Sequence, residues 1–110
     1  PYRLIILCSG DTGKKDGKTI DLEGWFPSQQ KYGELASCSI LRDYQGRRSN
    51  IKYQWDGKTI FADTLNNTAI ATERAMACLV ENFQQKDGSI RIPKVLWKYT
   101  GFKEIAARKA

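Results

Sequence analysis

The stretch TIDLEGWF, residues 19–26, alternates between polar and apolar side chains, and it decides the fold class. The alternation predicts a β-strand with one apolar face (Ile20, Leu22, Phe26) and one polar face (Thr19, Asp21, Glu23). Antiparallel sheets commonly leave one polar face in solvent, which is one interpretation of Asp21 and Glu23. The other interpretation is that these two carboxylates form the floor of a polar cleft.

Further strands are predicted on both sides of this stretch. The apolar run at residues 2–8 ends at Ser9-Gly10 and predicts a buried strand. Residues 32–40 form a second alternating segment, and residues 43–48 are typical of a short polar helical turn. Asp56-Gly57 is a strong two-residue hairpin signal between residues 50–55 and 59–65.

The hydrophobic period then changes from two to that of a helix. Apolar side chains recur at helical spacing at five positions (Ala75, Met76, Leu79, Val80, Phe83). Thr72 is the expected N-cap of this helix, and Gly88 is expected to end it at the C-terminal side. We expect a brief extended piece at Ile90 and Ile92, a short helix from Pro93 to Tyr99, and a frayed tail after Phe102. Strands followed by helices indicate an α+β fold, an antiparallel sheet with flanking helices.

Composition sets the class of protein. The 110 residues suit one domain or part of a larger one, and the 41% of hydrophobic residues is enough for a core. The longest apolar run, residues 4–8, is too short to span a membrane, and no signal peptide is expected. The net charge of +6 favours nucleic acid or an anionic ligand as a partner.

Cysteine and histidine usage limits the chemistry. The sequence has three cysteines, Cys8, Cys38 and Cys78. An odd number of cysteines that lie far apart in the sequence argues against a disulfide framework or a Cys-x-x-Cys metal site. We expect buried free thiols in a reducing compartment. The sequence contains no histidine, so no Ser-His or Cys-His nucleophile pair can form within it.

The stretch GKKDGKT, residues 13–19, superficially resembles a phosphate-binding P-loop. Its two glycines are one residue too close, and Thr19 leads into a strand rather than a helix. No helix N-terminus is then available to bind phosphate, so we reject this interpretation.

Glu34 and Ser37 could hold Mg²⁺, which prefers oxygen ligands. Strict alternation would place them on opposite faces of a strand, so joint binding requires a β-bulge or a strand end between them. The alternative is an ordinary strand.

A second candidate group lies where a strand runs into the long helix. Asn66 and Thr68 are two residues apart and share one face of an extended chain. Arg74 lies in the first helical turn, where a cation opposes the helix dipole and an anionic partner would offset the cost. The alternative is a surface arginine paired with Glu73 or another acid.

Several stretches, in order and at compatible spacing, resemble seryl-tRNA synthetases of class II. They are DLEGWFP at residues 21–27, YGELASCS at 32–39, DYQGRR at 43–48, and residues 64–74 with LVENFQQKDG at 79–88. The resemblance extends over almost the whole chain. It implies the C-terminal part of a catalytic domain, with the family's motif 3 at about residues 60–82.

The resemblance also implies roles for individual residues. Arg74 matches the motif 3 arginine that contacts the ATP phosphates, and Glu34 and Ser37 match the residues that hold ATP through the catalytic Mg²⁺. Asn66 and Thr68 match residues that line the serine pocket. The implied reaction joins serine and ATP into seryl-adenylate and then transfers the seryl group to tRNA(Ser). The implied enzyme is a homodimer in the cytoplasm or an organelle, not at a membrane.

The chain also departs from the family pattern. Gly33 stands where many members have Arg, Gly46 where many have Ala, and residues 40–42 (ILR) replace the more usual Asn-x-x. The tRNA-binding arm, motif 1 and motif 2 are not recognisable, so we expect these 110 residues alone to be inactive. A non-catalytic synthetase-like module that binds RNA or a partner, and an unrelated basic nucleic-acid-binding domain, remain the alternatives.

Overall fold

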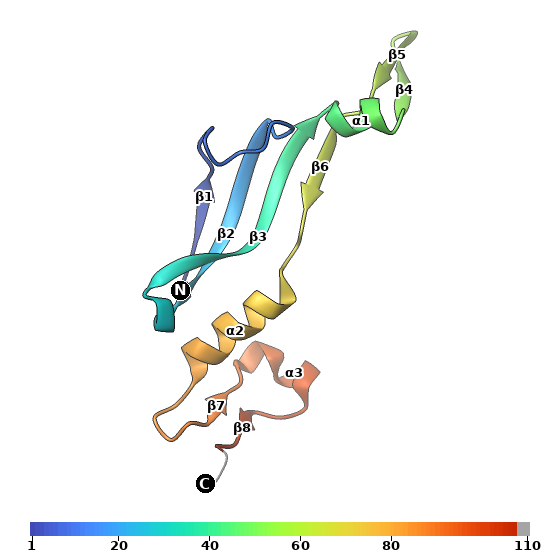
Figure 1. Ribbon diagram of the computed structural model, residues 1–110. Helices are drawn as coiled ribbons and strands as arrows, with labels where there is room; N and C mark the ends of the chain where they lie inside the picture. The colour runs from blue at the N-terminus through green and yellow to red at the C-terminus, as the bar shows by residue number, and fades with distance from the viewer. Residues whose placement is uncertain (108–110) are drawn as a thin grey trace.

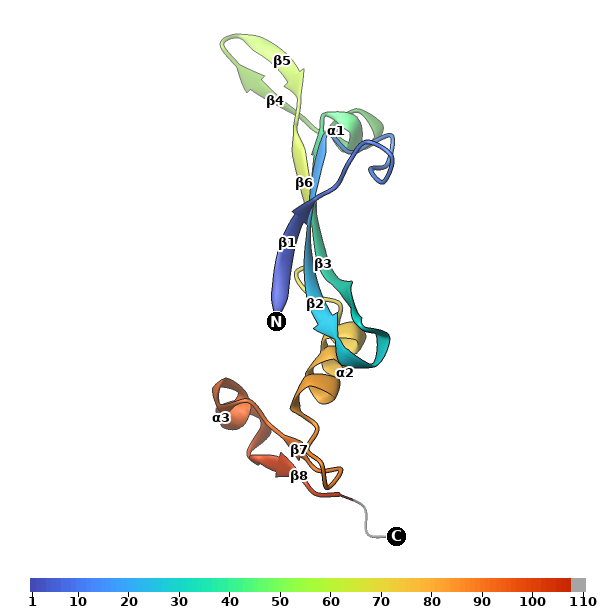
Figure 2. The same ribbon diagram turned by 90° about the vertical axis from the view of Figure 1, so that its left-hand side faces the viewer.

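The computed structural model describes residues 1–107. The molecule is elongated, with extents of 69 × 33 × 20 Å and a radius of gyration of 20.1 Å (Figure 1). A compact domain of this length would have a radius of gyration of about 13 Å. A central sheet occupies the middle, a hairpin projects from one end, and a small helical unit lies at the other (Figure 2).

The central sheet confirms the predicted α+β class. Its four antiparallel strands lie in the order β1-β2-β3-β6. They are β1 (Tyr2–Ile6), β2 (Lys18–Phe26), β3 (Lys31–Arg42) and β6 (Thr64–Asn67). The short 3-10 helix η1 (Pro27–Gln29) turns β2 into β3. The stretch that predicted the fold therefore forms a central strand with a neighbour on each side.

The prediction that the first strand is buried is wrong. Tyr2, Leu4 and Ile6 are 73%, 66% and 67% exposed, and within the described residues β1 pairs with β2 alone. The apolar side chains of this strand suit a buried face, but no element within residues 1–107 packs on them. Cys8, which follows this strand, is exposed rather than buried, and its thiol donates to Asp11. Cys78 is buried as predicted, and all three thiols are free.

Helix α2 (Thr72–Phe83) packs against the apolar side of β2 and β3. The contact is close because β2 has a glycine there: a Cβ at Gly24 would lie 2.7 Å from both Cys78 Sγ and Leu35 Cδ1. Asn82 Nδ2 donates to the Trp25 carbonyl at 2.8 Å and fixes the helix to the strand. The N-cap is Ala71, which has an extended backbone, and not Thr72 as predicted. Thr72 is already the first residue of the helix, and its hydroxyl donates to the neighbouring Glu73 carboxylate instead of capping.

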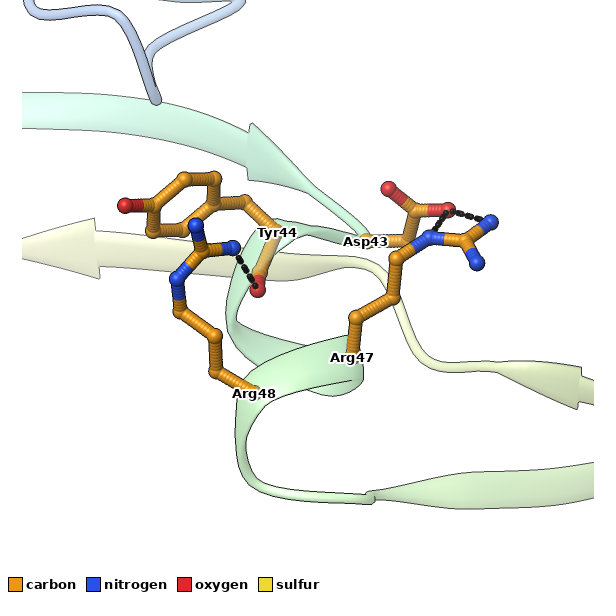
Figure 3. A network of polar contacts seen from close by, with 4 residues as sticks. All are labelled: Asp43, Tyr44, Arg47 and Arg48. Atoms are coloured by element: carbon orange, nitrogen blue, oxygen red, sulfur yellow. Dashed lines mark hydrogen bonds and ion pairs between the residues drawn. The ribbon is translucent and has the colours of Figure 1, made fainter.

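At one end of the sheet lie α1 (Tyr44–Arg48) and the hairpin of β4 (Lys52–Trp55) and β5 (Lys58–Phe61), as predicted. The two arginines of α1 fold back onto the start of the helix (Figure 3). Arg47 pairs with Asp43 at 2.7 Å, and the Arg48 guanidinium stacks 3.5 Å from the Tyr44 ring centroid. Both cations therefore stabilise α1 itself.

Gly46 explains one departure from the family pattern. It is buried in α1, and a Cβ at this position would lie 2.3 Å from the Ala62 carbonyl oxygen. The chain between β5 and β6 thus passes close to the helix backbone, in space that an alanine side chain would need.

The other end holds β7 (Ile90–Arg91), η2 (Lys94–Leu96), α3 (Trp97–Thr100) and β8 (Glu104–Ile105). The extended piece and the short helix after Pro93 are confirmed. The expected frayed tail is wrong as far as residue 105, because Glu104 and Ile105 pair with β7. The last three residues of that predicted tail lie outside the described residues.

Candidate functional site

The polar face of the sheet, on the side away from α2, gathers the candidate residues in transverse rows. Two rows run from β1 across β2 to β3, and the third runs from β2 across β3 to β6. In that order the rows are Arg3, Glu23 and Glu34; Ile5, Asp21 and Ser37; and Thr19, Ser39 and Asn66. Neighbouring members of a row lie on adjacent strands, about 4.8 Å apart. Asp21 and Thr19 are only 7% and 3% exposed, so this face is a partly enclosed floor rather than an ordinary solvated surface.

A β-bulge at Leu35 brings Glu34 and Ser37 onto this same face. Leu22 pairs with Ala36, whereas the next residue of β2, Glu23, pairs with Glu34, so that Leu35 is an extra residue in β3. Leu35 points to the α2 side, where it contacts the Gly24 position. Two consecutive apolar residues thus face the helix, and the carboxylate and the hydroxyl on either side of them face the polar floor. The bulge that joint metal binding requires is present.

Arg74 reaches this face from the first turn of α2. Its Nη1 donates to the Glu34 backbone carbonyl at 3.2 Å and lies 3.6 Å from Glu34 Oε2. Both side chains are more than two-fifths exposed, so the ion pair adds about 0–1 kcal/mol to stability and leaves donors free for a ligand. Glu34 and Arg74 line a cavity of about 540 Å³ together with Tyr32, Lys31 and Phe26.

Asn66 and Thr68 lie at the opposite edge of the floor, on the far side of β3. Asn66 is the register partner of Ser39, and the Thr68 backbone N–H donates to the Ser37 carbonyl at 3.1 Å. Asn67, between them, points the other way and caps a tight turn by accepting from the Ala69 N–H. Asn66 and Thr68 are both exposed, so their polar groups are available on the side where Ser37 and Glu34 lie.

Arg3 is a residue of this face that the sequence analysis did not single out. Its Nε donates to Glu23 Oε2 at 2.5 Å, and its guanidinium lies 4.5 Å from the Tyr32 ring centroid. Tyr32 in turn packs edge-on against Trp25, with 5.1 Å between the ring centroids. The alternation of the YRLII stretch could have placed Arg3 on one face, but only the strand register shows that Glu23 is its partner.

A scan against protein families matches residues 1–83 to the tRNA synthetase class II core domain (G, H, P, S and T). The chain belongs to this family. Its relatives within the class II family include serine–tRNA ligases. It is 51% identical over 107 residues to the serine–tRNA ligase of Pyrococcus horikoshii, covering 96% of this chain and 24% of that protein. It is 50% identical to the serine–tRNA ligase of Metamycoplasma arthritidis, covering 98% of this chain and 26% of that protein.

Two solved structures have the same fold as this class II chain. The crystal structure of seryl-tRNA synthetase from Pyrococcus horikoshii complexed with ATP superposes with a TM-score of 0.94 at 50% identity, covering 99% of this chain and 25% of that one. The cytoplasmic serine–tRNA ligase of Naegleria fowleri, in complex with AMP, superposes with a TM-score of 0.88 at 40% identity, covering 99% and 26%. This chain thus spans about a quarter of the length of these relatives. None of its described helices is long and apolar enough to cross a membrane.

Proposed function

We propose that the full-length protein containing this chain is a serine–tRNA ligase, which uses ATP to activate serine and transfers it to tRNA(Ser). The observation that carries the proposal is the shared polar face. The register and the Leu35 bulge put Glu34 and Ser37 on the face that also carries Asn66, and the Thr68 N–H bonds to the Ser37 carbonyl. Arg74 reaches the same face from α2, next to Glu34. The resemblance in sequence to seryl enzymes supports serine as the amino acid.

Arg74 would bind the ATP phosphates. A guanidinium at the cavity edge, with donors not used by Glu34, can make charge-assisted hydrogen bonds to phosphate oxygens. Charge builds up on these oxygens as the serine carboxylate attacks the α-phosphate, so a fixed cation stabilises the transition state. That attack breaks the bond to pyrophosphate and gives seryl-adenylate, from which a terminal tRNA hydroxyl takes the seryl group and releases AMP.

Glu34 and Ser37 fit Mg²⁺ by the chemistry of their donors. A carboxylate that lines the cavity and a hydroxyl on the same face of the sheet are oxygen ligands of the kind that Mg²⁺ accepts while it keeps several waters. When bound, the ion would neutralise phosphate charge. Glu34 would have to hold the ion and Arg74 together, and its exposed carboxylate has two oxygens with which to do so.

Asn66 and Thr68 would line the serine pocket. Both present hydrogen-bonding groups on the face that holds Ser37, and a site that binds a substrate hydroxyl rejects an analogue without one because its own polar groups are then left unpaired. We further expect a homodimer that works in the cytoplasm or an organelle.

Serine-dependent ATP–pyrophosphate exchange by the full-length protein tests the proposal. We expect exchange with serine, a rate with alanine lower by two or more orders of magnitude, and charging of tRNA(Ser). Exchange with neither amino acid, at Mg²⁺ and ATP concentrations where ATP binds, would contradict the proposal. It would favour the second candidate, a synthetase-like module that binds RNA or a partner without chemistry.

A further inference from the structure

Asp21 has a buried carboxylate with no partner within the described residues. The residue is 7% exposed, and its Oδ1 is shielded from solvent with no donor in reach. The ion pairs formed by residues 1–107 join Arg3 to Glu23, Arg47 to Asp43 and Arg74 to Glu34, and none involves Asp21. A buried carboxylate in this state is costly unless a cation or a hydrogen-bond donor comes to it.

The neighbours of Asp21 indicate where such a donor comes from. Asp21 lies between Ile5 on β1 and Ser37 on β3, in the row that leads to Thr68. Ile5 offers no polar side chain, and the Ser37 hydroxyl makes no hydrogen bond to Asp21 within 3.5 Å. The open side of the carboxylate is therefore the polar floor, one strand away from the proposed Mg²⁺ ligands.

The other acids nearby are already engaged. Glu23, two residues along the same strand face, is paired with Arg3, and Glu34 is paired with Arg74. Asp21 is thus the one carboxylate of β2 on this face that is free to accept hydrogen bonds from a ligand. Mg²⁺ in proteins keeps part of its water shell, and carboxylates that accept hydrogen bonds from such water orient the ion and raise its affinity.

We propose that Asp21 is a positioning residue for Mg²⁺: it accepts hydrogen bonds from water molecules on the ion that Glu34 and Ser37 hold. This inference rests on the proposed function for the presence of ATP and Mg²⁺. It adds a third residue, from a different strand, to the two that the resemblance supplied. It also accounts for a carboxylate in the sheet floor that has no partner of its own.

Asp21→Asn in the full-length protein tests the inference through ATP binding rather than turnover. ATP affinity is measured by calorimetry as Mg²⁺ is titrated, without serine. We expect the Mg²⁺ concentration for half-maximal ATP affinity to rise tenfold or more, because losing an acceptor for ion-bound water typically weakens metal binding 10–100-fold. The KM for serine in exchange, at saturating Mg²⁺, should stay within about twofold.

Asp16→Asn is the matched control. Asp16 also has a buried Oδ1 without a partner, but its Oδ2 accepts from the Gly13 N–H in the loop between β1 and β2, away from the floor. For Asp16→Asn, the Mg²⁺ concentration that gives half-maximal ATP affinity (the Mg²⁺ midpoint) should not change. If Asp21→Asn does not fold, Asp21→Ala, which removes both the charge and every side-chain acceptor, takes its place with the same expectation.

Three outcomes would overturn the inference. An unchanged Mg²⁺ midpoint in a folded Asp21 variant is the first, and a raised KM for serine with an unchanged midpoint is the second, since it would assign Asp21 to the amino acid. Failure of both Asp21 variants to fold is the third, since it would make the carboxylate structural. Failure of the proposed function looks different: wild-type protein would bind ATP with Mg²⁺ but give no serine-dependent exchange.

Discussion

The Arg74 guanidinium lies across the free edge of β3, 3.2 Å from the Glu34 carbonyl oxygen and 3.6 Å from the Glu34 carboxylate. One residue of β3 thereby fixes the arginine through both its backbone and its side chain. Because β6 ends at Asn67, this part of β3 has no strand on the side away from β2 within the described residues, and Arg74 has room to reach the polar face.

Arg74→Lys should keep the charge but lose the planar fork that binds two phosphate oxygens at once. In the full-length protein we expect the rate of serine-dependent exchange to fall by at least a hundredfold. The melting temperature should change by less than about 2 °C, because the ion pair is exposed on both sides. Unchanged exchange would remove Arg74 from the phosphate site.

Thr68→Val keeps the shape of the side chain and removes its hydroxyl. If this hydroxyl helps to order the serine pocket, the ratio of exchange rates for serine over alanine should fall about 5–30-fold, the worth of one or two hydrogen bonds. Thr59→Val, on the projecting hairpin β4–β5, is the control and should leave the ratio as it is. An equal ratio in wild type and Thr68→Val would show that Thr68 does not discriminate.

Gly46→Ala tests the close approach of the chain to α1. In an open helix this change stabilises by up to about 1 kcal/mol. Here the new methyl group would meet the Ala62 carbonyl oxygen at 2.3 Å, a backbone atom that cannot move alone, so we expect a loss of about 1–3 kcal/mol in the free energy of unfolding. Gly10→Ala, with nothing closer than 3.9 Å, is the control. A gain in stability for Gly46→Ala would mean that the β5–β6 connection moves aside freely.

Two of the three cysteines, Cys8 and Cys78, should differ in reactivity. Burial raises the pKa of the Cys78 thiol above its ordinary value, chiefly by desolvation, whereas Cys8 is exposed. At pH 8 we therefore expect iodoacetamide to modify Cys8 many times faster than Cys78, as read by mass spectrometry of the native protein. Since the unfolded thiol ionises first as pH rises, Cys78 should also make the fold less stable above about pH 8.5. Equal rates at both cysteines would contradict the packing of α2 on the sheet.

Local patterns predicted most of the elements, because turn and period signals are local. Asp56-Gly57 marked the hairpin, and the helical spacing marked α2. Strict alternation failed at Leu35-Ala36, where two adjacent apolar residues between Glu34 and Ser37 were themselves the signal of a bulge. The pattern could not show which strands pair, so the rows that join Asp21 to Ser37, and Arg3 to Glu23, depend on tertiary register.

The outward faces were harder to predict for a different reason. The apolar run at Tyr2, Leu4 and Ile6 shows that these side chains suit a covered face, but no local pattern says whether the cover lies within the same stretch of chain. The departure at Gly46 is similar, because its close neighbour, the Ala62 carbonyl, is sixteen residues away. Contacts of this kind depend on the tertiary packing of elements that are distant in the sequence, which local sequence patterns do not encode.

The isolated residues 1–110 should not activate serine and should self-associate. Tyr2, Leu4 and Ile6 are each at least 66% exposed, and within residues 1–107 both β1 and β6 leave one edge of the sheet unpaired. An open edge beside exposed apolar side chains is a template for pairing with another chain. With a radius of gyration of 20.1 Å, against about 13 Å for a compact domain of this length, the piece also exposes more surface than a compact domain would.

Sedimentation and exchange assays on the purified 110-residue piece measure both parts of this prediction. We expect oligomers at micromolar concentration, no serine-dependent exchange, and weak RNA binding that falls steeply between 50 and 200 mM salt, as charge-driven binding does. Leu4→Lys with Ile6→Lys should reduce the association by placing charge on the open strand, whereas Val95→Lys, on the exposed side of η2, should not. A soluble monomer that turns over serine would show that the polar face of this chain suffices for catalysis, and the apolar face of β1 would then need no cover.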